Sequence, residues 1–163
     1  MKYKNLVLGC LILSVVLLSV LLVRLYSSQK DQLAQIFSDS VETIIEYGKE
    51  PSRDFEYIAI DFDSLKGLEQ PEKEALRAYF EAKFQVPVLD ASYLELLDQG
   101  IENRSEEISG LIVYVEKIEN QIFSYNVHIA KEYGSLGANS IIVKFHLKEG
   151  VWKIWKVKLN WVA

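Results

Sequence analysis

The longest apolar stretch of the chain lies near its beginning. Residues 6–23 carry only apolar and small side chains, and the stretch ends at Arg24. As a helix it would be about 27 Å long, close to the ~30 Å hydrocarbon core of a membrane. Leu25 and Tyr26 extend it and place an aromatic ring at the interface. We therefore expect a transmembrane helix that anchors the chain in a membrane through residues 6–25.

Two other interpretations of this segment stay open, namely a cleaved signal peptide and a lipoprotein signal that ends at Cys10. The apolar core of a signal peptide has only ~7 to 15 residues, and its cleavage site needs small residues, where this chain has Leu25 and Tyr26. The lipobox-like residues 7–10 precede most of the apolar stretch instead of following it. Both observations favour a permanent anchor.

Charges beside the apolar stretch predict its orientation. Lys2, Lys4 and the terminal amine precede it, and one arginine and one lysine follow closely. The tail before the span is too short to form a domain, and positive charges favour the cytoplasmic side. We expect a cytoplasmic tail and anchor over residues 1–26, followed by one extracytoplasmic domain over residues 27–163, in the cell membrane.

Apolar residues at helical spacing predict three helices in this domain. The first covers residues 30–48. The second begins at Pro71, a residue that suits the first helical position, and ends before Pro87. A third, short helix follows Ser92, which has the spacing of a capping box to Glu95.

One strand is predicted before these last two helices, and four strands are predicted after them. Residues 55–62 are rich in β-branched and aromatic side chains, and from Ile108 onward apolar residues recur with a period of two. Four consecutive strands of this kind indicate an antiparallel meander. We therefore predict an α+β fold in which, after the transmembrane helix, helices pack on one face of a four-stranded or five-stranded antiparallel sheet.

The register of the last hairpin can be predicted from its apolar residues. A three-residue loop over residues 148–150 pairs Val143 with Trp155 and keeps apolar side chains on one face. A two-residue loop would pair Val143 with Lys156, so we prefer the longer loop, with Trp155 and Trp161 in the core. The opposite face then carries Lys144, His146, Lys148, Trp152, Lys156 and Lys158.

Charge is unevenly distributed between the two parts of the domain. Residues 27–107 hold 8 Lys and Arg against 19 Asp and Glu, whereas residues 108–163 hold 7 against 4. The acidic balance of the whole disfavours nucleic acid as a partner. The lysines of the sheet have two interpretations: they protect a sheet edge and complement the acidic helices, or they face an anionic or protein partner, such as a cell-wall polymer, lipid headgroups or an acidic protein.

One short motif suggests chemistry. An apolar strand over residues 58–60 ends in Asp61-Phe62-Asp63. It resembles the first motif of the haloacid-dehalogenase phosphatases, which implies Asp61 as the nucleophile, Asp63 as the acid and base, and magnesium bound by the pair. That family uses a parallel α/β sheet, whereas antiparallel strands are predicted downstream here. We therefore expect the two aspartates to end a strand and stabilise a turn.

No other pattern indicates catalysis, a cofactor or a metal. His128 and His146 are the only histidines, each falls on the polar face of a predicted strand, and the domain has no cysteine beside them. The chain also lacks a glycine-rich phosphate loop and a nucleophile elbow. We expect no metal site, no cofactor and no catalytic residue.

Glycine and tryptophan mark the last hairpin. Gly134, Gly137 and Ala138 precede a strand, residues 150–154 read Gly-Val-Trp-Lys-Ile, and Asn160-Trp161 follows. This pattern resembles the last hairpin of cystatin-like or NTF2-like α+β domains in small bacterial surface proteins. Such folds host enzymes, pocket binders and inert domains alike, so the resemblance implies a fold and no activity.

The function we expect from these observations is that of a single-pass, membrane-anchored protein with a small non-enzymatic binding or assembly domain outside the membrane. The alternative is a small-pocket enzyme or ligand binder that uses Asp61 and Asp63 in an NTF2-like fold.

Overall fold

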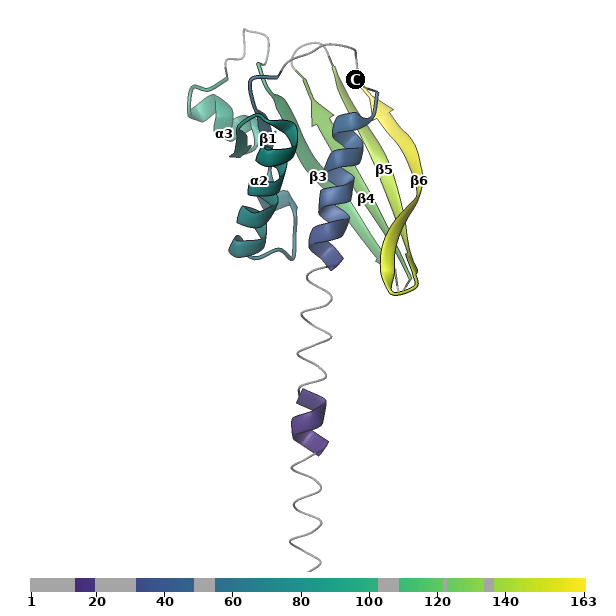
Figure 1. Ribbon diagram of the computed structural model, residues 1–163. Helices are drawn as coiled ribbons and strands as arrows, with labels where there is room; N and C mark the ends of the chain where they lie inside the picture. Colours follow the sequence, from purple (N-terminus) through teal and green to yellow (C-terminus); the bar gives the residue numbers. More distant parts are fainter. Residues whose placement is uncertain (1–13, 20–31, 49–54, 103–108, 122, 134–136) are drawn as a thin grey trace, which may run out of the picture.

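The computed structural model describes residues 14–19, 32–48, 55–102, 109–121, 123–133 and 137–163. The fold is α+β, as predicted (Figure 1). Its strands are β1 (Ile58–Ile60), β2 (Val88–Asp90), β3 (Leu111–Gln121), β4 (Ser124–Glu132), β5 (Ala138–Lys148) and β6 (Val151–Val162). Its helices are one over residues 32–46, the short 3-10 helix η1 (Phe62–Ser64), α2 (Gln70–Phe84) and α3 (Tyr93–Asp98).

Most of the predicted membrane anchor lies outside the described residues. Residues 14–19 are helical with exposed side chains, whereas residues 6–13 and 20–26 are not described. Within the described ranges, no helix combines the length and the apolar character that crossing a membrane requires. The transmembrane helix stays a prediction from the sequence.

The strands form one mixed sheet of six, in the order β2-β1-β3-β4-β5-β6. Strands β3 to β6 form the predicted antiparallel meander, but β1 runs parallel to both β2 and β3. The prediction of a four- or five-stranded, wholly antiparallel sheet is therefore wrong. The physical reason is that α2 carries the chain back along β1, so that β2 starts in the same direction as β1. Strand β2 has only three residues, too few to show alternation.

Helices cover both faces of the sheet, which corrects the prediction of helices on one face. The helix of residues 32–46 and α2 pack on the face that we call the inner face. Helix α3 packs on the opposite, outer face, where Leu96 contacts the cluster of Ala59 and Ile112. All three residues of β1 are buried, Ile58 and Ile60 toward the inner face and Ala59 toward the outer face. A strand that is apolar on both sides needs cover on both sides.

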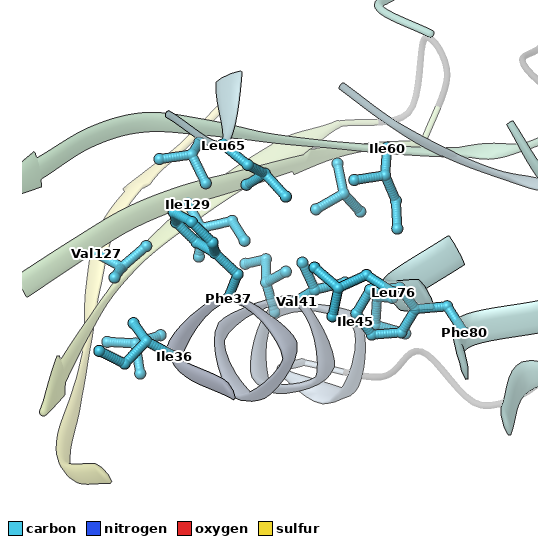
Figure 2. Close-up of a cluster of buried hydrophobic side chains, with 14 of the residues drawn as sticks. Ile36, Phe37, Val41, Ile45, Ile60, Leu65, Leu76, Phe80, Val127 and Ile129 are labelled. Carbon is cyan, nitrogen blue, oxygen red and sulfur yellow. The ribbon is translucent and has the colours of Figure 1, made fainter. Parts of the chain in front are cut away.

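The main core lies between the inner face and the helix of residues 32–46. Figure 2 shows Phe37 and Val41 of this helix directed at Val127 and Ile129 of β4, with Phe80 of α2 at the side of the cluster. All five side chains are fully buried. Phe37 and Val41 are four residues apart in the helix, and Val127 and Ile129 are two residues apart in the strand, as the sequence pattern predicts.

Polar contacts hold both ends of this helix on the sheet. At its start, Trp152 Nε1 of β6 donates a hydrogen bond to Gln32 Oε1 at 3.0 Å. At its end, the buried Lys131 Nζ of β4 donates to the carbonyl oxygens of Tyr47 at 2.6 Å and of Ile45 at 3.4 Å. The last carbonyls of a helix lack intrahelical donors and carry a partial negative charge. Lys131 supplies both the donor and the opposite charge.

A second polar contact joins this helix to α2. Tyr79 Oη donates to Glu42 Oε1 at 2.5 Å, and Lys83 forms an ion pair with the same carboxylate. Partial burial alone would raise the pKa of Glu42, but the hydrogen bonds from Lys83 and Tyr79 outweigh it and lower that pKa. The two inner-face helices are thus joined by charge as well as by apolar packing.

The predicted helices α2 and α3 are confirmed, although α2 begins one residue before Pro71. Helix α2 begins at Gln70 with Pro71 in its first turn, and Gln85 in the left-handed conformation follows its end. Helix α3 begins after Ser92, which forms the predicted capping box with Glu95. Hydrogen bonds from Ser92 hold the pKa of Glu95 below its ordinary value.

The last hairpin has a two-residue turn, Glu149-Gly150, so the predicted three-residue loop is wrong. Both turn residues have positive φ, 56° and 78°, which matches the twist of the two strands. Lysines still stay out of the core because Trp155 is an extra residue in β6: Phe145 pairs with Ile154, and the next pair is Lys144 with Lys156. This β-bulge changes the side of every residue that follows it.

Candidate binding surface

Five lysines of the β5–β6 hairpin lie together on the outer face. Pairing across the two strands places Lys144 opposite Lys156, His146 opposite Lys153, and Ile142 opposite Lys158. We call this set the lysine face, and it consists of Lys144, Lys148, Lys153, Lys156 and Lys158. Of the six residues predicted for this surface, the structure brings together Lys144, His146, Lys148, Lys156 and Lys158.

Lys153 belongs to this surface but was not predicted for it. In the three-residue loop that the sequence favoured, Lys153 would point to the inner face. The two-residue turn reverses its side, because a shift of one residue moves each side chain to the opposite face. The only sequence signal for the two-residue turn is Gly150, because Glu149, which also has positive φ, is not a residue type that prefers it.

Trp152 does not belong to the lysine face, and its predicted place there is wrong. It pairs with Leu147 on the inner face and is only 7% exposed. Its ring meets the ring of Tyr125 edge to face, with centroids 4.8 Å apart. Together with its hydrogen bond to Gln32, this packing makes Trp152 part of the core.

Trp155 and Trp161, predicted in the core, both lie on the outer face instead. Trp155 is 55% exposed, and its ring centroid lies 6.5 Å from that of His146. Trp161 pairs with Ser140 after a second register shift, and its Nε1 donates to Glu116 Oε1 at 2.9 Å. Trp155 thus supplies an exposed aromatic ring beside the lysines.

No ion pair joins the lysine face to a carboxylate in the part of the chain that the structure describes. The carboxylates of the same face have other partners: Glu116 accepts from Trp161, and Glu119 pairs with Lys117 at 2.6 Å. The hydrogen bond from Lys117, followed by that from Asn126, lowers the pKa of Glu119 to about 2. The positive charge of the lysine face is therefore not neutralised by these carboxylates.

The cross-strand pair of Lys144 and Lys156 opposes the stability of the sheet. Like charges directly opposite each other in neighbouring strands are unfavourable, and the effect is about 0.2–1 kcal/mol for such pairs. An anionic group placed between the two ammonium groups would remove this repulsion.

The two histidines lie apart from each other on the outer face. His128 Nε2 lies 3.9 Å from Glu119 Oε2, and His146 lies beside Trp155. In the described ranges, no three His, Cys, Asp or Glu side chains form a group able to hold a metal ion.

Asp61 and Asp63 follow β1, at the opposite end of the sheet order from the lysine face. Asp61 Oδ1 accepts from Ser64 N at 3.1 Å and caps η1. Ser64 Oγ in turn donates to the Asp61 carbonyl and accepts from Val115 N at 3.0 Å. Asp63 is exposed and pairs with Lys73 at 2.7 Å. The expectation that Asp61 ends a strand and stabilises a turn is confirmed.

No family model, curated protein or solved structure matches this chain. The resemblance to cystatin-like or NTF2-like domains stays a prediction.

Proposed function

We propose that this protein is a membrane-anchored, non-enzymatic binding domain, and that the lysine face takes an acidic segment of a partner protein outside the membrane. The observation that carries this proposal is the set of five lysines on one face of the hairpin, with no ion pair to the described carboxylates and with two ammonium groups directly opposite each other. The anchor, residues 6–25, rests on the apolar stretch of residues 6–23.

Edge protection accounts for only part of this surface. Strand β6 is the edge of the sheet, so Lys153, Lys156 and Lys158 are where charged residues discourage strand addition. Lys144 lies on β5, which has a neighbour on both sides. Its position opposite Lys156 is better explained by a partner that covers both strands.

The character of the surface favours a protein over a polymeric anion. Trp155 is exposed among the lysines, and tryptophan is one of the residue types enriched in protein interfaces. Residues 27–163 as a whole hold 15 Lys and Arg against 23 Asp and Glu, so a long polyanion that extends beyond the hairpin would meet repulsion.

Support for the cystatin-like or NTF2-like fold hypothesis comes from the helix of residues 32–46 packed across the meander of β3 to β6. The elements β1, α2, β2 and α3 would then be an insertion between that helix and the meander.

Crosslinking of the full chain in native membranes tests the proposal. The test variant carries Lys144→Gln, Lys156→Gln and Lys158→Gln. The control carries Lys66→Gln, Arg77→Gln and Lys117→Gln, which remove the same charge from sites outside the lysine face.

We expect the native chain and the control to form the same protease-sensitive adduct, and the test variant to lose it roughly tenfold, a change of about 1.4 kcal/mol in binding. Rising salt should weaken the adduct. Equal adducts from both variants, or an adduct that resists protease and yields to a glycan hydrolase, would overturn the proposal.

A further inference from the structure

Two turns at one end of the sheet expose apolar side chains. Phe123, between β3 and β4, is 70% exposed, and Val151, directly after the last turn, is 43% exposed. The two turns are neighbours, because the backbone N–H of Leu147 donates to the carbonyl of Phe123 at 3.2 Å. Lys148 is exposed between them. We call Phe123, Leu147, Lys148 and Val151 the sheet tip.

The sheet tip lies at the end of the domain where the chain enters it. The hydrogen bond from Trp152 to Gln32 joins the last hairpin to the first described turn of the helix of residues 32–46. Figure 1 shows the turn of β5 and β6 at the same end of the domain as the start of this helix, and the C-terminus at the other end. The predicted anchor ends at Tyr26, six positions before Gln32. A chain of this length spans at most about 20 Å between these two residues. An anchor at that position would hold the tip near the membrane surface.

We propose that the sheet tip rests on the outer membrane surface, with Phe123 and Val151 in the interfacial layer and Lys148 against anionic lipid headgroups. This inference rests on the anchor in the proposed function. Exposed apolar side chains such as Phe123 and Val151 gain free energy when they leave water for the boundary of headgroups and acyl chains, and a lysine close to it extends its ammonium group toward anionic headgroups. The lysines tested above for partner binding, Lys144, Lys156 and Lys158, lie farther along the strands from the turn.

Strand β6 offers a matched pair of positions to test this contact. Val151 and Val162 are the same residue type at opposite ends of one strand, 43% and 66% exposed. The full chain, with Cys10→Ser, carries Val151→Cys or Val162→Cys labelled with an environment-sensitive fluorophore. It is reconstituted into vesicles of equal parts phosphatidylcholine and phosphatidylglycerol that contain a headgroup-labelled quencher lipid.

We expect the quencher lipid to quench the label at position 151 several-fold more strongly than the label at position 162. Adding Lys148→Glu should weaken the quenching at 151 in these vesicles and leave it unchanged in phosphatidylcholine alone.

Equal quenching at the two positions in a chain that floats with the vesicles would overturn the tip contact and leave the anchor intact. A label at 151 that is shielded from aqueous iodide but not quenched by lipid would show a protein cover, and would also overturn the proposal. A chain that does not float would overturn both the anchor and the tip contact.

Discussion

The two faces of the meander differ in how their side chains are satisfied. On the inner face, apolar residues pack against the helix of residues 32–46. Hydrogen bonds hold both ends of this helix, from Trp152 to Gln32 at its start and from Lys131 of β4 to the carbonyl of Tyr47 at its end. On the outer face of β5 and β6, lysines lie without ion pairs to the described carboxylates, and Trp155 is exposed. The inner face thus stabilises the domain, whereas the outer face carries like charges that repel each other.

The strongest test of this difference replaces one aromatic side chain on each face. Phe37→Ala should lower the free energy of unfolding by about 3–5 kcal/mol, because it leaves a cavity among fully buried side chains. Trp155→Ala should lower it by less than about 1 kcal/mol, since the ring is largely in solvent. Urea denaturation of the full chain in a mild detergent measures both, and equal losses would contradict the contrast between the faces.

A comparison of two lysines gives the next largest effect. Lys131→Met keeps the length of the side chain but leaves the carbonyls of Ile45 and Tyr47 without this charged donor, so we expect a loss of about 1–3 kcal/mol. Lys156→Met on the outer face is the matched control and should cost nothing. If both variants unfold at the same denaturant concentration, Lys131 does not hold the helix as described.

The outer face should gain stability when its charge is reduced. Lys156→Glu turns the repulsive pair with Lys144 into an attractive one, and we expect a gain of about 0.2–1 kcal/mol. The same change should weaken the crosslinked adduct of the proposed partner. Thermal unfolding and the crosslinking yield together would show whether stability and binding change in opposite directions, and a destabilised Lys156→Glu chain would refute this account.

The smallest predicted effect concerns pH. The pKa of Glu42 is lower in the folded chain than its ordinary value, so the folded state is stabilised at pH above that value and loses this contribution as the pH falls through the lowered pKa. The pair with Lys83 is partly exposed, which limits the effect to about 0.3–1 kcal/mol. Glu42→Gln should therefore lose stability at neutral pH, and its difference from the native chain should vanish as the pH falls through the lowered pKa in denaturation measurements.

Much of the inner face could be predicted from the sequence. The apolar positions of residues 30–48 and of the meander repeat with the periods of a helix and of strands, and those periods determine which side chains meet. Strand β2 could not be found in this way, because three residues after Pro87 show no period. The outer-face position of α3 depends on Ala59, a small apolar residue that makes one strand buried on both sides.

The lysine face was largely predicted despite a wrong register. The predicted register has a three-residue loop and no bulge, whereas the structure has a two-residue turn and a bulge. Both registers assign each residue from Lys156 to Leu159 to the same face. They differ between the turn and the bulge, where the predicted register puts Trp152 and Lys153 on the wrong faces, and again after the second register shift, where Trp161 lies on the outer face. Alternation alone does not locate a bulge, because Ile154, Trp155 and Val157 are all apolar.

Because of the bulge at Trp155, β6 has one residue more there than the paired segment of β5, and this residue can be deleted without changing the pairing. Phe145 pairs with Ile154 and Lys144 with Lys156, so Trp155 occupies no position in the ladder. A chain from which Trp155 is deleted would keep each of these pairs and straighten the strand. Deleting this one residue would thus remove the aromatic ring from the lysine face while every lysine keeps its cross-strand partner, so the proposed roles of the ring and of the lysines can be tested separately.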